Sequence, residues 1–205
     1  MAIERKKIVA EAIALLDEVG YDNLTTRRLA ERLGVKQPAL YWHFKNKRAL
    51  LDAIDESILA PHHAAATPRA SDDWRVFLVS YGESIRRALL AHRDGGRVHA
   101  GAPPSHDQLG QTDAQITLLC GAGFSPLIAM QALLTINAFV LGSVIDQQAD
   151  EEHGLGWDKA EALTDGRLPA FEASLTAMQE GGRDAAFTAG LEMIVIGLGA
   201  MRQKS

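Results

Sequence analysis

The sequence of 205 residues contains one cysteine, Cys120, and aromatic residues make up only 6% of it. A single cysteine can form no internal disulfide, which favours a reducing compartment such as the cytoplasm. Strand-type patterns are nearly absent, whereas apolar residues recur at helical spacing along most of the chain. No cationic start followed by an apolar core and a cleavage site opens the sequence, so export is not expected. These observations predict an all-α, cytoplasmic protein.

Long apolar runs are scarce as well. The stretch from Leu127 to Ile145 comes nearest to a membrane span, but it lacks basic flanks and is interrupted by polar residues. We expect this stretch to form a buried helix of a bundle, and we expect no membrane partner. The interrupting residues are Gln131, Thr135, Asn137 and Ser143.

The fixed spacings that mark many catalytic centres are missing too. The sequence has no HExxH or similar arrangement, and no nucleophile–base pair stands out. Catalytic zinc usually needs three protein ligands with an open fourth position. We therefore expect no enzymatic activity, and the alternative is a metal hydrolase built around His63, His99, His106 and Asp146.

Positive charge is concentrated at the start of the chain. Residues 1–48 contain ten Lys or Arg and six Asp or Glu, whereas the whole chain has a formal net charge of −5 and a pI near 5.8. A protein with this balance does not attract nucleic acid as a whole. Only its first segment is expected to do so.

That basic segment ends in TTRRLAERLGVKQPALYWHFKNKR, residues 25–48, which has the pattern of a short helix, a glycine turn and a second short helix. Thr25 or Thr26 can cap the first helix. Gly34 supplies the turn because glycine reaches positive φ without steric cost. Pro38 fits the first turn of the second helix, where a missing N–H costs nothing. The pattern predicts a helix-turn-helix unit that binds double-stranded DNA.

The side chains of the second helix divide between base and phosphate contacts. Gln37 can pair with adenine, and the methyl group of Ala39 can pack on thymine in the major groove. Hydroxyl, imidazole, ammonium and guanidinium groups hold phosphates. An aromatic core is the alternative role for Tyr41, Trp42 and Phe44, and it is the role expected for Phe44. The expected DNA-binding residues are Thr26, Arg27, Gln37, Pro38, Ala39, Tyr41, Trp42, His43 and Lys47.

The motifs TTRRLA, LGV and LYWHFKNK resemble the DNA-binding domain of the tetracycline-repressor (TetR) family, and the similarity continues through ILAPHH, RRALLAHRDGGRVHAG and GFSP to about residue 148. Within the family the chain is most similar to the group of tetracycline repressors. The resemblance implies a homodimeric repressor that binds a palindromic operator and is released by a small hydrophobic or antibiotic-like inducer. A DNA-binding dimer without a ligand is the alternative.

The resemblance also implies a set of ligand contacts. In the group of tetracycline repressors the inducer is a drug chelated to Mg²⁺, and otherwise no cofactor is required. His99 matches the histidine that ligates the metal, and Asp146 matches a Glu that reaches it through water from the partner subunit. The implied ligand-binding residues are His63, Tyr81, Ile85, His99, Pro104 and Gln115.

Four positions depart from the pattern of that group. Tyr81 replaces an Asn, Ile85 replaces a Phe, and Ala102 and Pro103 replace a Thr and an Arg. Buried polar groups that lose a partner can discriminate between ligands by orders of magnitude. The changes therefore favour another inducer over tetracycline itself. Gly101–Pro104 is the expected place of a ligand-driven displacement, since Pro103 and Pro104 cannot continue the short helix that ends near His99.

The helical periods divide the chain into a DNA-binding domain, residues 1–46, and a ligand-binding and dimerisation domain, residues 47–205. A connecting helix is expected at about 47–60, capped by Asn46. Residues 149–167 are expected to form a mobile loop. The other expected helices are Arg5–Val19, Trp74–Ala91, Asp107–Ala122, Pro126–Gln148, Leu168–Met178 and Arg183–Met201.

The last of these helices contains interior glycines, whose cost in helix stability must be offset by other interactions. Glycine in a helix interior costs about 1 kcal/mol relative to alanine, and close approach of another helix would offset that cost. A loosely packed C-terminal helix is the alternative. The resemblance implies that Pro126–Gln148 and Arg183–Met201 pair with their copies in a four-helix dimer interface.

Overall fold

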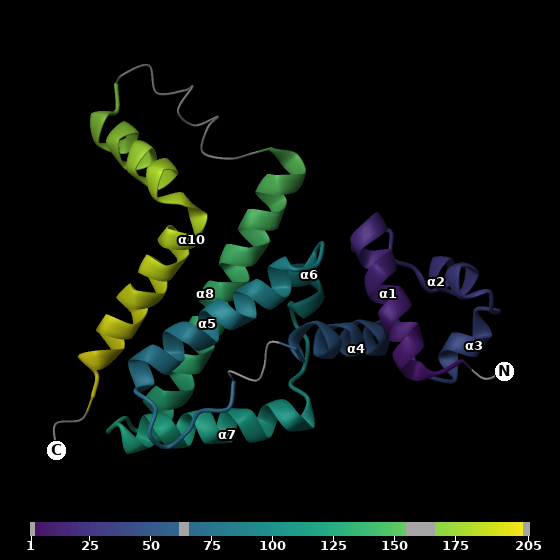
Figure 1. Cartoon of the computed structure of the whole chain (residues 1–205), viewed down its shortest axis with the longest axis horizontal. Helices are drawn as coiled ribbons and strands as arrows, with labels where there is room; N and C mark the ends of the chain where they lie inside the picture. The colour runs from purple at the N-terminus through teal and green to yellow at the C-terminus, as the bar shows by residue number, and fades with distance from the viewer. Residues whose placement is uncertain (1–2, 62–65, 155–166, 203–205) are drawn as a thin grey trace. The chain divides into compact units, whose positions relative to one another are not determined.

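The computed structural model describes residues 3–61, 66–154 and 167–202, and every regular element in these ranges is helical (Figure 1). The all-α fold expected from the sequence is thereby confirmed. The chain divides into two compact units, one of residues 1–69 and 84–115, the other of residues 70–83 and 116–205. These units reflect compactness, so the functional division expected at residue 47 stays a prediction.

The first unit begins with a head of three helices, α1 (Arg5–Val19), α2 (Thr26–Leu33) and α3 (Pro38–Tyr41). The bounds of α1 are those expected from its apolar stripe, of which Ile8 and Leu16 are fully buried. Thr25 caps α2, since its Oγ1 accepts a hydrogen bond from the Arg28 N–H at 3.2 Å. Gly34 ends α2 with φ of 66°, as the turn requires.

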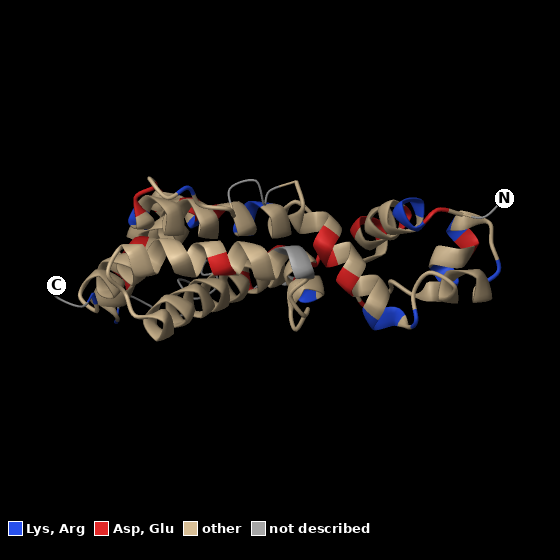
Figure 2. Cartoon of the chain, turned by 90° about the horizontal axis from the view of Figure 1, so that it is seen from below, with Lys and Arg blue, Asp and Glu red and all other residues tan. Residues whose placement is uncertain are grey.

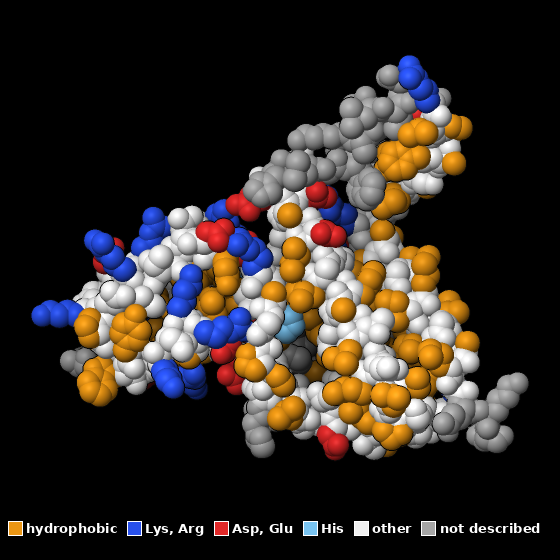
Figure 3. All heavy atoms as spheres, turned by 180° about the vertical axis from the view of Figure 1, so that it is seen from behind, with side chains coloured by type: hydrophobic (Ala, Val, Ile, Leu, Met, Phe, Trp, Pro, Cys, Tyr) orange, Lys and Arg blue, Asp and Glu red, His pale blue; other side chains and the backbone are white. Residues whose placement is uncertain are grey.

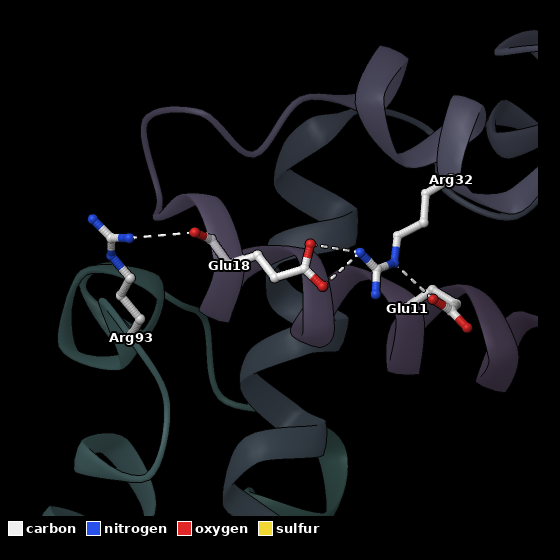
Figure 4. Close-up of polar contacts among 4 residues, drawn as sticks. All are labelled: Glu11, Glu18, Arg32 and Arg93. Atoms are coloured by element: carbon white, nitrogen blue, oxygen red, sulfur yellow. Dashed lines mark hydrogen bonds and ion pairs between the residues drawn. The ribbon is translucent and has the colours of Figure 1, made fainter.

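An arginine on α2 ties that helix to α1 (Figure 4). Arg32 donates from Nε to Glu11 at 2.8 Å and from Nη1 to both carboxylate oxygens of Glu18 at 2.8 Å. The hydrogen bonds to Glu11, and then those to Glu18, raise the pKa of Arg32. Figure 4 also shows Arg93, whose Nη1 donates to the backbone oxygen of Glu18 at 3.4 Å. The hydrogen bonds of Arg32 thus join α2 to α1.

The aromatic residues that follow α2 differ clearly in how far their side chains are buried. Phe44 is 4% exposed and belongs to the core, as expected, whereas Trp42 is 90% exposed and Tyr41 is half exposed. The core alternative therefore does not hold for Trp42 within this chain. Helix α3 is one turn long, and the backbone N–H groups of His43 and Phe44 continue to donate to the Leu40 oxygen beyond it.

Helix α4 (Lys47–Leu59) begins at Asn46, whose side chain accepts from the Ala49 N–H at 2.9 Å. The predicted cap and connecting helix are confirmed. The buried stripe of α4 packs against α1 and against α6 (Gly95–His99), so the same helix contacts the head and the segment that carries His99. The stripe includes Leu50, Leu51, Ile54 and Ile58, and one acidic residue, Asp55, is buried among them.

The second unit contains α8 (Pro126–His153) and α10 (Pro169–Gly199), together with parts of α5 (Trp74–Leu90) and α7 (His106–Gly121). Phe139 of α8 stacks on Phe187 of α10 with ring centroids 5.3 Å apart. A Cβ placed on Gly190 would lie 2.5 Å from the Phe139 ring, so this glycine does permit close helix approach. The loose-packing alternative is excluded at this position.

Two regions differ from expectation by more than one or two residues. Helix α8 continues to His153, where Gly154 with φ of 57° ends it, so the loop expected from residue 149 was wrong for its first five residues. Residues 155–166 of the expected loop lie outside the described part of the chain. The two helices expected near the C-terminus form one element, α10, which is broken at Gly182 by φ of 75°.

Helix α8 is long and apolar enough to cross a membrane by length and composition alone. The core helix of a soluble bundle passes the same test. Only 33% of its most apolar stretch is buried within the described part of this chain, so the fully buried helix expected from the sequence is found along one stripe only. The buried residues include Ala132, Leu133, Ile136, Val140 and Val144.

Candidate functional site

The residues expected to meet DNA all lie in the head or at the start of α4, and none of them is buried. Gln37 is oriented by a hydrogen bond, since its Nε2 donates to Thr26 Oγ1 at 2.8 Å. Its amide oxygen therefore keeps a fixed direction, while Pro38 and Ala39 follow in the first turn of α3. The head thus presents a polar edge beside the exposed rings of Tyr41 and Trp42.

The basic residues of the head are interspersed with acidic ones (Figure 2). Arg27 forms an exposed pair with Glu31, with Nε and Oε1 3.0 Å apart. Such exposed pairs contribute little, so Arg27 can exchange Glu31 for a phosphate at small cost. Lys47 is exposed, and its Nζ lies 5.4 Å from the centroid of the Tyr21 ring. These side chains are available for phosphate contacts, and their role in DNA binding stays a prediction.

The implied metal ligand, His99, is the last residue of α6. Its Nδ1 lies 2.9 Å from Oδ1 of Asp55, and the two side chains are 25% and 5% exposed respectively. Arg48 makes a second polar link from α4, since its Nη1 donates to the Ala100 oxygen at 3.4 Å while its Nε donates to Asp52 at 2.7 Å. The C-terminal end of α6 is therefore joined to α4 twice.

The chain turns immediately after this end of α6. Gly101 has φ of 72°, and the Ala102 N–H donates to the His99 oxygen at 3.0 Å. Pro103 and Pro104 follow outside any helix, and both are exposed. The expected place of displacement is thus a defined turn, and its movement stays a prediction.

Of the other implied ligand contacts in the first unit, two are buried. Gln115 is 2% exposed, and its Nε2 donates to the Ala66 oxygen at 2.7 Å. Ile85 is 6% exposed. The role of both residues toward an inducer stays a prediction. His63 lies outside the described residues.

Two implied contacts belong to the second unit and are described there. Tyr81 is 7% exposed, and its hydroxyl donates to Oδ1 of Asn137 on α8 at 3.2 Å. The phenol therefore satisfies its hydrogen bond within the protein. Asp146 is exposed on α8. The roles of both residues toward a ligand stay predictions.

A Mg²⁺ ion fits this donor set. Among the described residues no group of three or more His, Cys, Asp or Glu could hold a metal ion by itself. Mg²⁺ usually keeps several waters and takes one or two protein ligands plus oxygens of its partner molecule. One imidazole nitrogen with its remaining positions completed by a chelating ligand agrees with that chemistry.

Sequence reasoning missed the polar contacts of α6. Asp55 and Arg48 on α4 were not singled out, nor were the residues that join α6 to the turn after α1. The available signal was a carboxylate inside an apolar stripe, because Asp55 lies one turn from Leu51 and next to Ile54. A charged residue at such a position is almost never fully buried unless it is paired.

Comparison with known proteins decides the family. The model described as "Bacterial regulatory proteins, tetR family" matches residues 8–54, and that described as "Tetracyclin repressor-like, C-terminal domain" matches residues 67–202. The chain belongs to the TetR family. It is 50% identical to the tetracycline repressor protein class A from transposon 1721 of Escherichia coli, over 98% of this chain and 92% of that protein.

Solved structures of TetR proteins agree with this assignment. TetR (class A) in complex with 5a,6-anhydrotetracycline and magnesium matches with a TM-score of 0.78 and 47% identity, over 98% of this chain and 100% of that one. TetR from Acinetobacter baumannii AYE matches with a TM-score of 0.82 and 44% identity, over 98% and 100%. The fold and the head are thus those of a TetR-type regulator along nearly the whole chain.

Membership of the TetR family confirms the prediction of a helix-turn-helix transcription regulator that is not an enzyme. The alternative of a metal hydrolase is thereby dropped. Membership also implies a DNA partner, a dimeric state and, for a soluble regulator of transcription, a place in the cytoplasm.

Proposed function

We propose that this TetR-family protein is a homodimeric repressor that binds a palindromic operator and is released by a tetracycline-type inducer chelated to Mg²⁺. The observation that carries the proposal is the placement of His99, at the end of α6 and joined to the connecting helix α4. The relatives named above support the ligand class, since one was solved with anhydrotetracycline and magnesium.

The DNA-binding part of the proposal assigns separate roles to the residues of the head. Gln37 and Ala39 read base edges, while Tyr41, His43 and Lys47 contact phosphates. Two heads related by twofold symmetry meet half-sites about 34–36 Å apart on one side of the duplex. A palindromic operator follows from this symmetry.

The second copy is proposed to pack on α8 and α10. Both helices carry large apolar side chains that a single chain leaves exposed, and hydrophobic side chains gather on the face shown in Figure 3. Exposed apolar patches of this kind usually mark interaction surfaces. The side chains are Leu127, Met130 and Leu134 on α8 and Met193 and Ile196 on α10.

The inducer is proposed to act through α6. Nε2 of His99 would hold the Mg²⁺, Asp146 of the partner subunit would reach it through water, and the ion would supply the charge that ligand oxygens chelate. A ligand shifts an equilibrium only by its differential affinity for the two states. Such coupling typically amounts to about 1–3 kcal/mol, or roughly 5- to 150-fold in operator affinity.

Four positions that differ from the pattern of the tetracycline repressors affect which inducer is preferred. They are Tyr81, Ile85, Ala102 and Pro103. A phenol, an aliphatic side chain and a proline replace groups of different size and hydrogen-bonding capacity. We therefore propose that the preferred inducer differs from tetracycline in its substituents. An inducer of unrelated chemistry is the alternative.

The test is an operator-binding titration on the full-length protein. Fluorescence anisotropy of a labelled operator would be followed while tetracycline, minocycline and anhydrotetracycline are added with Mg²⁺ or with EDTA. We expect release with Mg²⁺ and little release with EDTA. A compound that occupies the protein, shown by its thermal stabilisation, without changing operator affinity would refute the switch. Absence of any stabilising compound would favour a ligand-independent DNA-binding dimer.

A further inference from the structure

Asp55 is a buried acidic side chain that is not among the residues expected to contact DNA. It lies on α4 among apolar residues and is 4% exposed as a whole residue. Burial of a carboxylate is costly unless the group is paired and hydrogen-bonded. The partner that offsets this cost is Nδ1 of His99, 2.9 Å away on α6. The pair therefore joins two helices through a residue implied in ligand binding.

The chemistry of the pair determines the state of the imidazole ring. A carboxylate only accepts hydrogen bonds, so the proton between the two groups belongs to Nδ1 of His99. In a neutral imidazole the lone pair is then on Nε2, the nitrogen that faces away from Asp55. Histidines that ligate metals commonly donate their second N–H to a carboxylate, which fixes tautomer and ring orientation.

We propose that Asp55 is a positioning residue for a ligand that carries a divalent cation. It holds His99 in the Nδ1–H tautomer, aims Nε2 at the cation, and makes α4 respond to occupation of that nitrogen. The inference rests on the function proposed above, and it adds a residue outside the set implied by the family resemblance.

The coupling to α4 follows from the polarity of the imidazole ring. His99 coordinated through Nε2 donates more strongly from Nδ1, because withdrawal of electron density makes the N–H more acidic. Hydrogen bonds with an ionised partner are shorter and stronger than neutral ones. Occupation of Nε2 therefore tightens the α4–α6 link at Asp55.

A purely structural role for Asp55 makes a different prediction. If the carboxylate only stabilised the packing of α4 on α6, its removal would lower thermal stability and leave the tautomer of His99 and the metal dependence of ligand binding unchanged. Two readouts therefore separate the roles. Asp52 offers a matched control on the same helix, since it pairs with Arg48 at 2.7 Å and lies nearer the surface.

The first readout is the tautomer of His99 in the inducer-free full-length protein. Two-bond ¹H–¹⁵N correlation spectra of histidine-labelled protein would distinguish Nδ1–H from Nε2–H. We expect Nδ1–H in the unmodified protein and in Asp52→Asn, and loss of that preference in Asp55→Ala. Asp55→Asn should retain it, because the amide oxygen can still accept from Nδ1. An Nε2–H tautomer in the unmodified protein would overturn the inference.

The second readout is the Mg²⁺ dependence of anhydrotetracycline binding, followed by ligand fluorescence. We expect Asp55→Ala to raise the half-saturating Mg²⁺ concentration by about 10- to 100-fold, with a smaller effect for Asp55→Asn and none for Asp52→Asn. In a His99→Ala background, Asp55→Ala should add no further effect. An equal effect in both backgrounds would show that Asp55 acts independently of His99 and would overturn the proposal.

The two readouts also separate this inference from the function on which it rests. If the unmodified protein bound no anhydrotetracycline at any Mg²⁺ concentration, the proposed inducer class would be refuted. The tautomer measured without inducer would then still support or overturn the role of Asp55 in holding His99.

Discussion

Arg97 of α6 donates two parallel hydrogen bonds to Asp22 in the turn after α1, from Nη1 to Oδ2 at 2.9 Å and from Nη2 to Oδ1 at 2.8 Å. The guanidinium also lies 4.6 Å from the centroid of the Tyr21 ring. Tyr21 precedes Asp22 in the turn after α1, and its backbone N–H donates to the buried carboxylate of Asp94 at 2.7 Å. The head is thus held to α6 directly, as well as through α4.

This pair predicts a pH-dependent contribution to stability. The hydrogen bond from Arg97 lowers the pKa of the Asp22 carboxyl, and the same hydrogen bond raises the pKa of Arg97. The pKa of a carboxyl in the unfolded chain is about 4. When folding lowers that pKa, the ionised carboxylate stabilises the fold at every pH above about 4. This contribution is lost as the pH falls through the pKa of the folded state. Arg97→Ala should therefore lower the melting temperature at pH 7 by more than it does well below pH 4, where the contact with the Tyr21 ring is still lost but Asp22 is protonated.

Differential scanning calorimetry of both proteins between pH 3 and pH 7 measures this difference. Arg27→Ala removes an exposed pair with Glu31 and serves as the control, because such pairs contribute little. A deficit of Arg97→Ala that is as large at pH 3 as at pH 7 would contradict the prediction.

Mutations should distinguish the residues of the head that contact bases from those that contact phosphates. Gln37→Ala should cost about 1–3 kcal/mol at one base pair of each half-site and relax preference there. Lys47→Ala should weaken binding at all sequences and reduce the salt slope by about one. Operator and random DNA titrated at several salt concentrations would show the difference. Arg202→Ala removes a charge from the other compact unit and should change neither quantity.

Gly95 at the start of α6 should not tolerate a side chain. A Cβ at this position would overlap the carbonyl oxygen of Leu89, a backbone atom that cannot turn aside. Overpacking of this kind typically costs about 1–3 kcal/mol, so Gly95→Ala should lower the free energy of unfolding by that amount. Gly110 on α7 has open space around it, and Gly110→Ala should raise stability by up to about 1 kcal/mol. Urea unfolding of both variants would refute this assignment if the two shifted alike.

The proposed dimer depends on apolar side chains that a single chain exposes. Leu134 and Ile196 are 58% and 74% exposed, and a glutamate at either position would bury a charge in the interface. Leu134→Glu and Ile196→Glu should therefore yield folded monomers with greatly weakened operator binding. Sedimentation velocity measures the state of association. Val76→Glu changes an equally exposed apolar residue on α5 and should remain dimeric, whereas dimers of all three variants would place the interface elsewhere.

The elements of this fold were predictable where their signals are local. The bounds of α1, the Thr25 cap, the Gly34 turn and the Asn46 cap depend on residues within a few positions of each other. The sequence motifs likewise located the head and the position of His99. Local signals ended α8 too early, because the polar residues 149–153 stay helical up to Gly154, whose left-handed backbone ends the helix. They also separated the two segments of α10, which are one element with a kink at Gly182.

The contacts that join elements could not be predicted in the same way. Asp55 and His99 are 44 positions apart, and Asp22 and Arg97 are 75 apart. Which of the chain's many charged residues meet depends on how α4 and α6 pack, and periodicity carries no information on that. The buried carboxylate of Asp55 was visible as an irregularity of the apolar stripe, but its partner was not.

The non-helical backbone of Gly182 divides α10 into two helical segments. In a continuous helix each added residue turns everything beyond it by about 100°. A glycine at φ of 75° breaks that regular rotation and kinks the element. The rotational setting of the segment before Gly182 therefore does not dictate which way the buried side chains of Phe187, Leu191 and Val195 point.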